Sequence, residues 1–165
     1  MKRVILDTNI YGRMIERKEE EKVQRALEKR KDVIIYGFDV VRKELRDLSG
    51  QTLIGRKKLR ILLLVLYDKL AKAHIYFTTS LVTRLAEDYH FAYRQIGGNK
   101  PKDKIFNDFL IVACASVHEL DIAVSDDNKS MLSNEAINAY KIINNMRKYR
   151  MPEFIGYEKF RRLFS

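Results

Sequence analysis

Short apolar runs that alternate with longer helical patterns are the feature that most constrains the fold of this chain. We expect β-strands at 2–6, 33–36, 122–125 and 154–155, with a further short strand at 75–77. Helical patterns cover 10–31 (in one or two pieces), 40–48, 53–73, 81–96, 109–119, 157–163 and part of 135–149. Strands that alternate with helices indicate a parallel sheet. We therefore predict an α/β fold, a three-layer α/β/α sandwich around a central, mostly parallel twisted sheet.

Basic residues dominate the charge of the chain, which is long enough for one domain over 1–165. It carries 32 Lys and Arg against 22 Asp and Glu, a formal net charge of +10. This excess favours a polyanionic partner, and its spread along the whole chain favours nucleic acid over a membrane surface. The longest purely apolar run, Ile61–Tyr67, is too short for a membrane span, and the opening run is broken at Asp7. We therefore expect a cytoplasmic protein with no secretory signal and no membrane contact.

Cysteine and histidine offer no metal site in this sequence. The one cysteine, Cys114, lies in an apolar helical stretch, where a small buried side chain is the simplest interpretation. The three histidines, His74, His90 and His118, share no metal-ligand spacing. We therefore look to carboxylates for any metal chemistry.

Four carboxylates stand at or near the ends of apolar segments, namely Asp7, Glu44, Asp108 and Asp127. Asp7 ends the first predicted strand, and Asp127 follows a later one. Ligands of an open parallel sheet bind outside the carboxyl ends of its strands. Carboxylate oxygens suit Mg²⁺ and Mn²⁺. On a basic chain, this set of acids predicts phosphodiester chemistry.

Glu44 has an unusual position on its predicted helix. At about 100° per residue it falls within the apolar arc formed by Val40, Val41, Leu45 and Leu48. A carboxylate on a core-facing arc is costly unless it is paired or bound to a metal. An ion pair with a neighbouring Arg is the alternative, and we favour a functional site.

Two of the other acids also have structural explanations. Any of Asp7, Thr8 and Asn9 is a good helix N-cap, but capping does not need three such residues. We interpret Asp7 as a ligand that Thr8 or Asn9 orients. Asp108 is expected in the first turn of its helix, where the helix dipole stabilises an acid. Asn107 is a natural cap for that helix, which leaves Asp108 free to point elsewhere.

The fourth position is contested by the neighbouring acids Asp126 and Asp127. Side chains alternate along a strand, so only one of the two should point toward the site, and spacing alone does not choose between them. Each acid of the set has a structural explanation by itself. Four independent structural explanations at once would be a coincidence, whereas one shared site explains all four acids, and we therefore favour a site.

Four segments in this order resemble the PIN domain family, over nearly the whole chain. They are 4–9 (VILDTN), 43–45 (KEL), 107–113 (NDFLIVA) and 124–127 (VSDD). The family is the nuclease fold of toxins in toxin–antitoxin modules and of RNA-processing enzymes. Its last strand ends in Thr-x-Asp, so the resemblance places Ser125 on the Thr and Asp127 on the fourth acid, with Asp126 in reserve.

The resemblance implies a metal-dependent endoribonuclease that cleaves single-stranded RNA. In that scheme Asp7, Asp108 and Asp127 hold one or two Mg²⁺ or Mn²⁺ ions, and Glu44 is an outer ligand or a water-orienting base. The surrounding positions are Thr8, Asn9, Asn107 and Ser125. A catalytically weak PIN-like module that binds RNA or a protein is the alternative. The acidic residues by themselves do not distinguish cleavage of RNA from cleavage of DNA.

Two basic clusters are candidates for guiding the RNA backbone, namely Lys100, Lys102 and Lys104 and the run Arg56, Lys57 and Lys58. A solvated surface is the alternative for each side chain. The helix around Leu59, Leu62, Leu63 and Leu66 is apolar enough to form an interface or, equally, to be deeply buried. A toxin role implies a small antitoxin as partner, and a homodimer is a second use of this surface.

Overall fold

The computed structural model describes residues 1–48 and 50–165 and has a five-stranded sheet at its centre. The strand order is β5-β2-β1-β6-β7, and every neighbouring pair runs parallel. The strands are β1 (Lys2–Leu6), β2 (Val33–Phe38), β5 (Ile75–Tyr76), β6 (Ile122–Val124) and β7 (Glu153–Ile155). In the middle strand β1, Val4, Ile5 and Leu6 are all buried, as expected for a strand covered on both faces. All five predicted strands are confirmed.

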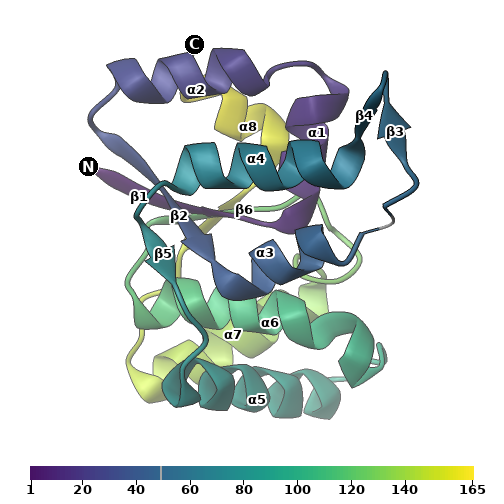
Figure 1. Cartoon of the computed structure of the whole chain (residues 1–165). Helices are drawn as coiled ribbons and strands as arrows, with labels where there is room; N and C mark the ends of the chain where they lie inside the picture. The colour runs from purple at the N-terminus through teal and green to yellow at the C-terminus, as the bar shows by residue number, and fades with distance from the viewer. Residues whose placement is uncertain (49) are drawn as a thin grey trace.

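Helices cover both faces of the sheet, so the predicted α/β/α sandwich is confirmed (Figure 1). On one face lie α1 (Thr8–Glu16), α2 (Glu20–Lys29), α4 (Leu59–Ala71) and α8 (Tyr157–Arg162). On the other lie α5 (Ser80–Gln95), α6 (Lys102–Val117) and α7 (Asn134–Arg147). The remaining helix, α3 (Asp39–Arg46), packs against both α4 and α6 and so joins the two helical layers.

The helical pattern over 10–31 forms two helices, α1 and α2. Between them Lys18 adopts a φ of 54°, in the left-handed region that cannot continue a right-handed helix. Glu19 follows as the residue that starts α2. The two-piece form of the prediction is therefore the right one.

The prediction of one helix over 53–73 is wrong for its first part. Leu53–Ile54 (β3) and Lys57–Lys58 (β4) pair as a short antiparallel hairpin, and α4 begins only at Leu59. The turn uses Gly55, whose φ of 62° lies in the region that favours glycine. The helical pattern missed this turn because the apolar residues on either side of it fit both periodicities.

The start of α6 also differs from the prediction, which began the helix near 109 and made Asn107 its cap. The helix begins at Lys102, directly after Pro101, so Asn107 and Asp108 lie in its second turn. The first turn is exposed and polar, and apolar periodicity therefore missed it. Asp108 is a residue of the helix body, and the helix-dipole explanation for it is removed.

Helix α6 is the most completely buried helix of the fold. Its residues from Phe109 to Ser116 are all buried, Cys114 among them. In the described part of the chain, no helix is both long and apolar enough to cross a bilayer. The apolar character of α6 is therefore explained by its place in the core.

We predict that Gly37→Ala lowers the free energy of unfolding by about 2–3 kcal/mol, the usual scale for overpacking a core. A Cβ at Gly37 would lie 2.3 Å from the Tyr67 hydroxyl, which donates to the Phe38 carbonyl at 3.1 Å, and 2.9 Å from the Ala71 Cβ. Urea denaturation measures the loss. Gly12→Ala in α1 is the matched control, because a Cβ there meets nothing within 4 Å. It should leave stability unchanged or raise it by up to about 1 kcal/mol.

Candidate active site

Asp7 stands at the carboxyl end of β1 and is also the N-cap of α1. The residue is only 5% exposed. It accepts three hydrogen bonds, from the Thr8 amide at 2.7 Å, the Asn9 side chain at 3.0 Å and the Ser125 hydroxyl at 2.7 Å. Burial raises the pKa of Asp7, these donors lower it, and the charge of Asp127 raises it. The carboxylate is therefore held in one orientation by groups from two neighbouring strand ends.

Glu44 reaches the same place from α3. It is half-buried, and its Oε1 accepts a hydrogen bond from the Thr8 hydroxyl at 3.1 Å. Burial and then the charge of Asp7 raise the pKa of Glu44 to about 7, while bonds from Thr8 and Asn107 lower it. Thr8 therefore orients Glu44. Leu48, predicted on the apolar arc beside it, lies beyond the end of α3 and is exposed.

Asp108 comes from the second turn of α6, the helix at the centre of one layer. Its pKa is raised to about 8, first by burial and then by the charges of Asp7, Asp127 and Glu44. All three other predicted acids thus act on Asp108. The structure therefore brings the four acids into one electrostatic cluster at the carboxyl edge of the sheet.

The neighbouring acids Asp126 and Asp127 lie in the turn after β6 and have different partners. Asp126 turns away from the cluster, where its Oδ1 accepts from the Tyr157 amide at 2.9 Å and its Oδ2 lies 3.4 Å from the Arg13 Nε. Asp127 accepts from the Ser130 amide at 3.0 Å, and its charge acts on two acids of the cluster. Asp127 is therefore the cluster member, and Asp126 is a structural acid that joins β6 to α1 and α8.

The chemistry of this donor set fits Mg²⁺ or Mn²⁺. All four groups are carboxylates, the ligands these ions prefer, and a cation would relieve the repulsion that raises the pKa of Asp108. The side chains are not drawn into a closed ligand set. Among residues 1–48 and 50–165, no three Asp, Glu, His or Cys side chains are arranged to hold a metal ion as they stand. An ion would therefore have to draw the carboxylates closer together.

The three lysines near the start of α6 differ in their surroundings. Lys100 is half-buried, donates to the Ser130 hydroxyl and lowers the pKa of Asp108 by its charge. Lys102 is exposed and paired with Glu87 at 2.7 Å. Lys104 is exposed on the first turn of α6. Of the three, Lys100 is the cation that acts on the acids.

The second basic cluster stands on the β3–β4 hairpin. Arg56, Lys57 and Lys58 are all exposed there, not on the helix that the sequence predicts. In Figure 1 this hairpin and the connection between α5 and α6 both lie on the side of the molecule where β1 ends. The hairpin therefore presents its charges at the same side of the molecule as the acids.

Two residues that the sequence did not single out also belong to the surroundings of the site. Arg13, from α1, forms an ion pair with Asp126 at 3.4 Å. Tyr140, from α7, is fully buried and donates to the Met131 carbonyl at 2.9 Å. Burial raises the pKa of Tyr140, as do the charges of Asp108, Asp7 and Asp127. A tyrosine or arginine at helical spacing carries no signal that distinguishes this role from an ordinary core or surface position.

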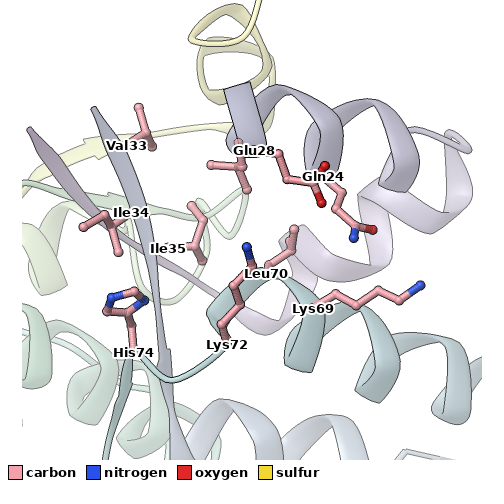
Figure 2. Close-up of a pocket in the computed structure, with 10 residues that line it drawn as sticks. Gln24, Glu28, Val33, Ile34, Ile35, Lys69, Leu70, Lys72 and His74 are labelled. Atoms are coloured by element: carbon pink, nitrogen blue, oxygen red, sulfur yellow. The ribbon is translucent and has the colours of Figure 1, made fainter. Parts of the chain in front are cut away.

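A small cavity at the opposite edge of the sheet is separate from the acids (Figure 2). It encloses about 90 Å³ between the start of β2, at Val33, and side chains of α2 and α4 such as Glu28 and Lys69. The strands are parallel, so the start of β2 is remote from the carboxyl edge. None of the four predicted acids lines this cavity. It is also smaller than the roughly 300 Å³ at which ligand pockets begin.

Comparison with known proteins shows a likeness in fold. No protein-family model and no curated protein matches the sequence. The chain is similar to a chain of VapBC2 from Rickettsia felis bound to a DNA fragment from its promoter, with 15% identity, a TM-score of 0.61 and coverage of 93% of this chain and 98% of that one. It is also similar to a chain of FitAB bound to IR36 DNA, with 17% identity, a TM-score of 0.54 and coverage of 93% and 94%. The fold is therefore PIN-like, as the motifs predicted.

We predict that the metal-free protein loses stability between pH 5 and pH 8 and that Asp108→Asn reduces this loss by about 1–3 kcal/mol. A carboxyl with a pKa of about 8 when folded, against an ordinary 3.8, keeps a proton between these values that the unfolded chain releases. The free energy of unfolding therefore falls as pH rises through this window, by about 1.4 kcal/mol per pH unit at most.

Urea denaturation in EDTA at pH 5 and pH 8 measures this effect. Asp103→Asn, a change at an exposed acid of the same helix, is the matched control and should keep the wild-type pH dependence. An equal pH dependence in wild type and Asp108→Asn would show that the pKa of Asp108 is not raised in the folded protein.

Proposed function

We propose that this protein is an endoribonuclease that hydrolyses phosphodiester bonds of single-stranded RNA and depends on Mg²⁺ or Mn²⁺. One observation carries the proposal. Carboxylates from the end of β1, from α3, from α6 and from the turn after β6 act on one another: Thr8 bonds to both Asp7 and Glu44, Ser125 bonds to Asp7 and to the Asp127 amide, and their charges, together with burial, raise the pKa values of Asp7, Glu44 and Asp108. Such a cluster at the carboxyl edge of a parallel sheet is suited to a divalent cation. The net charge of +10 supports a polyanionic substrate.

Each acid has a distinct task in this proposal. Asp7, Asp108 and Asp127 would hold one or two ions, and a bound ion activates water and stabilises charge on the phosphate oxygens. Glu44 is an outer ligand or the group that takes the proton of the attacking water. Its pKa of about 7 suits proton transfer near neutral pH. Asn9 and Ser125 orient Asp7, and Thr8 orients Glu44.

We also propose that the protein is the toxin of a toxin–antitoxin pair, with a small antitoxin as its partner in the cytoplasm. The similar chains of VapBC2 and FitAB come from toxin–antitoxin complexes, which supports such a partner. The four leucines first considered as an interface lie against the core, because Leu63 and Leu66 are buried and Leu59 and Leu62 are half-buried. The exposed apolar residues of α4 are instead Ile61 and Val65, on its outer side. An antitoxin or a second copy would cover these two side chains.

A catalytically weak module that binds RNA or a protein is the competing function. The two functions differ in whether RNA is cut. Loss of one acid would mark an inactive relative, and this chain has all four in one cluster. We therefore favour the nuclease.

The first test is cleavage of end-labelled single-stranded RNA with Mg²⁺ or Mn²⁺. We expect cutting that EDTA abolishes and that Asp7→Asn reduces by about 100-fold or more, the scale on which catalytic groups act. Asp127→Asn should lose as much. Asp126→Asn is its matched control and should keep activity within a few-fold, because Asp126 points away from the cluster. RNA binding without cutting, by wild type and variants alike, would favour the binding module.

The second test is the thermal stability of the protein with and without metal. An ion that binds only the folded state stabilises it by RT ln(1 + [L]/Kd), which is about 2.7 kcal/mol at 100 times Kd. We expect Mn²⁺ to raise the Tm of wild type and of Asp126→Asn, and to leave the Tm of Asp7→Asn and Asp108→Asn nearly unchanged. A wild-type Tm that does not respond to millimolar Mn²⁺ would contradict the metal site.

A further inference from the structure

A groove of about 510 Å³ lies beside the acids, between α3 and α6. Helix α3 forms one wall of the groove, and Asn107 and Leu110 of α6 form the other. The lining residues that matter for its chemistry are Val40, Lys43, Glu44, Arg46, Asn107 and Leu110. The volume falls within the roughly 300–1,000 Å³ of small-ligand sites.

The groove opens directly onto the acidic cluster. Glu44 and Asn107 both line it, from α3 and α6 respectively. Glu44 is in turn bonded to Thr8 and is close enough to Asp7 for that charge to raise its pKa. If one unit of a chain-like ligand lay in the groove, the next unit of that ligand would therefore lie at the acids.

The lining combines an apolar floor with a free positive charge. Val40 is half-buried and Leu110 is 8% exposed, so both present carbon surface to the groove. Lys43 is exposed at the rim and has no ion-pair partner among residues 1–48 and 50–165. Such a floor suits a flat base, and the ammonium suits a phosphate.

Two further acids line the groove, Asp39 at the start of α3 and Asp47 at its C-terminal end, and each has a partner. Asp39 accepts from the Thr78 amide at 3.0 Å and from the Thr78 hydroxyl at 2.7 Å. Asp47 lies 3.5 Å from the Nε of Arg46. Asp47 is thus paired with Arg46, whereas Asp39 is bonded to neutral groups and keeps its charge. Lys43 is the cation of the lining that would meet an anion.

We propose that this groove binds one nucleotide of the RNA strand next to the phosphate that lies at the acids. This inference rests on the proposed function and names a binding site for its substrate. The base lies on Val40 and Leu110, and the phosphate of that nucleotide meets Lys43. The cavity in Figure 2, at about 90 Å³, has no room for a nucleotide.

The test is the binding of a fluorescein-labelled RNA of about ten nucleotides, measured by fluorescence anisotropy in EDTA so that no cutting occurs. Lys43→Glu removes the phosphate contact and adds repulsion, and Val40→Phe fills the floor. We expect each to weaken binding by about fivefold or more. Lys22→Glu on α2 makes the same charge change at an exposed lysine away from the groove and should stay within twofold of wild type. Melting curves by circular dichroism check that each variant folds, and Lys43→Glu, at an exposed position, serves alone if Val40→Phe does not fold.

Two results would overturn the proposal that the groove binds a nucleotide. One is binding by Lys43→Glu within twofold of wild type, and the other is an equal loss in Lys22→Glu, which would mean diffuse attraction to a basic surface. The outcome is separate from that of the nuclease proposal. Groove-dependent binding with no metal-dependent cutting would leave the groove and remove the nuclease. Cutting with normal binding by the groove variants would do the reverse.

Discussion

The buried carboxylate of Asp7 at the end of the central strand is the constraint on which the rest of the site depends. A buried carboxylate requires hydrogen-bond donors, and Asp7, a residue that is 5% exposed, has three. The donors follow from the sheet register. Leu6 pairs with Val124 in the parallel ladder, so the next residues, Asp7 and Ser125, lie side by side. The Ser125 hydroxyl bonds to the Asp7 carboxylate and accepts from the Asp127 amide, so one serine links the ends of both strands.

The other acids add charge to a place that already disfavours it. Asp108 is carried by the most buried helix, and burial and three neighbouring acids raise its pKa to about 8. Lys100 is the cation that opposes this effect, and its bond to Ser130 keeps it beside the turn that carries Asp127. A fold that concentrates like charges in this way gives up stability at its site, which is common where function requires strain. A divalent cation would recover part of that stability.

Helix α3 connects the chemistry of the site with the space around it. Its residue Glu44 belongs to the acids, while Val40 and Lys43 on the same helix line the groove beside them. Since α3 packs on both α4 and α6, its position relative to the sheet is defined by both helical layers. An RNA strand held in the groove would therefore be positioned relative to the acids by helix α3.

The sequence by itself determined the α/β class, all five central strands and the four acids that the structure brings together. It could do so because burial imposes periodicity: runs such as Val4–Leu6 and Phe109–Ala115 are apolar wherever the fold covers both faces. It failed where local pattern carries no such signal. The hairpin at 53–58 and the exposed first turn of α6 are surface elements, defined by a left-handed glycine and by Pro101 and not by burial.

Only the tertiary structure decided which side chains point at one another. Asp126 and Asp127 are adjacent and chemically identical, and the contacts of Asp126 with Arg13 and the Tyr157 amide are what turn it away. Those partners lie far from Asp126 along the chain, so the spacing of residues around Asp126 does not predict them. The same holds for the groove between α3 and α6, which exists because two helices pack with unlike side chains between them. Residue types can be read in one dimension, whereas directions and cavities arise only when distant elements pack together.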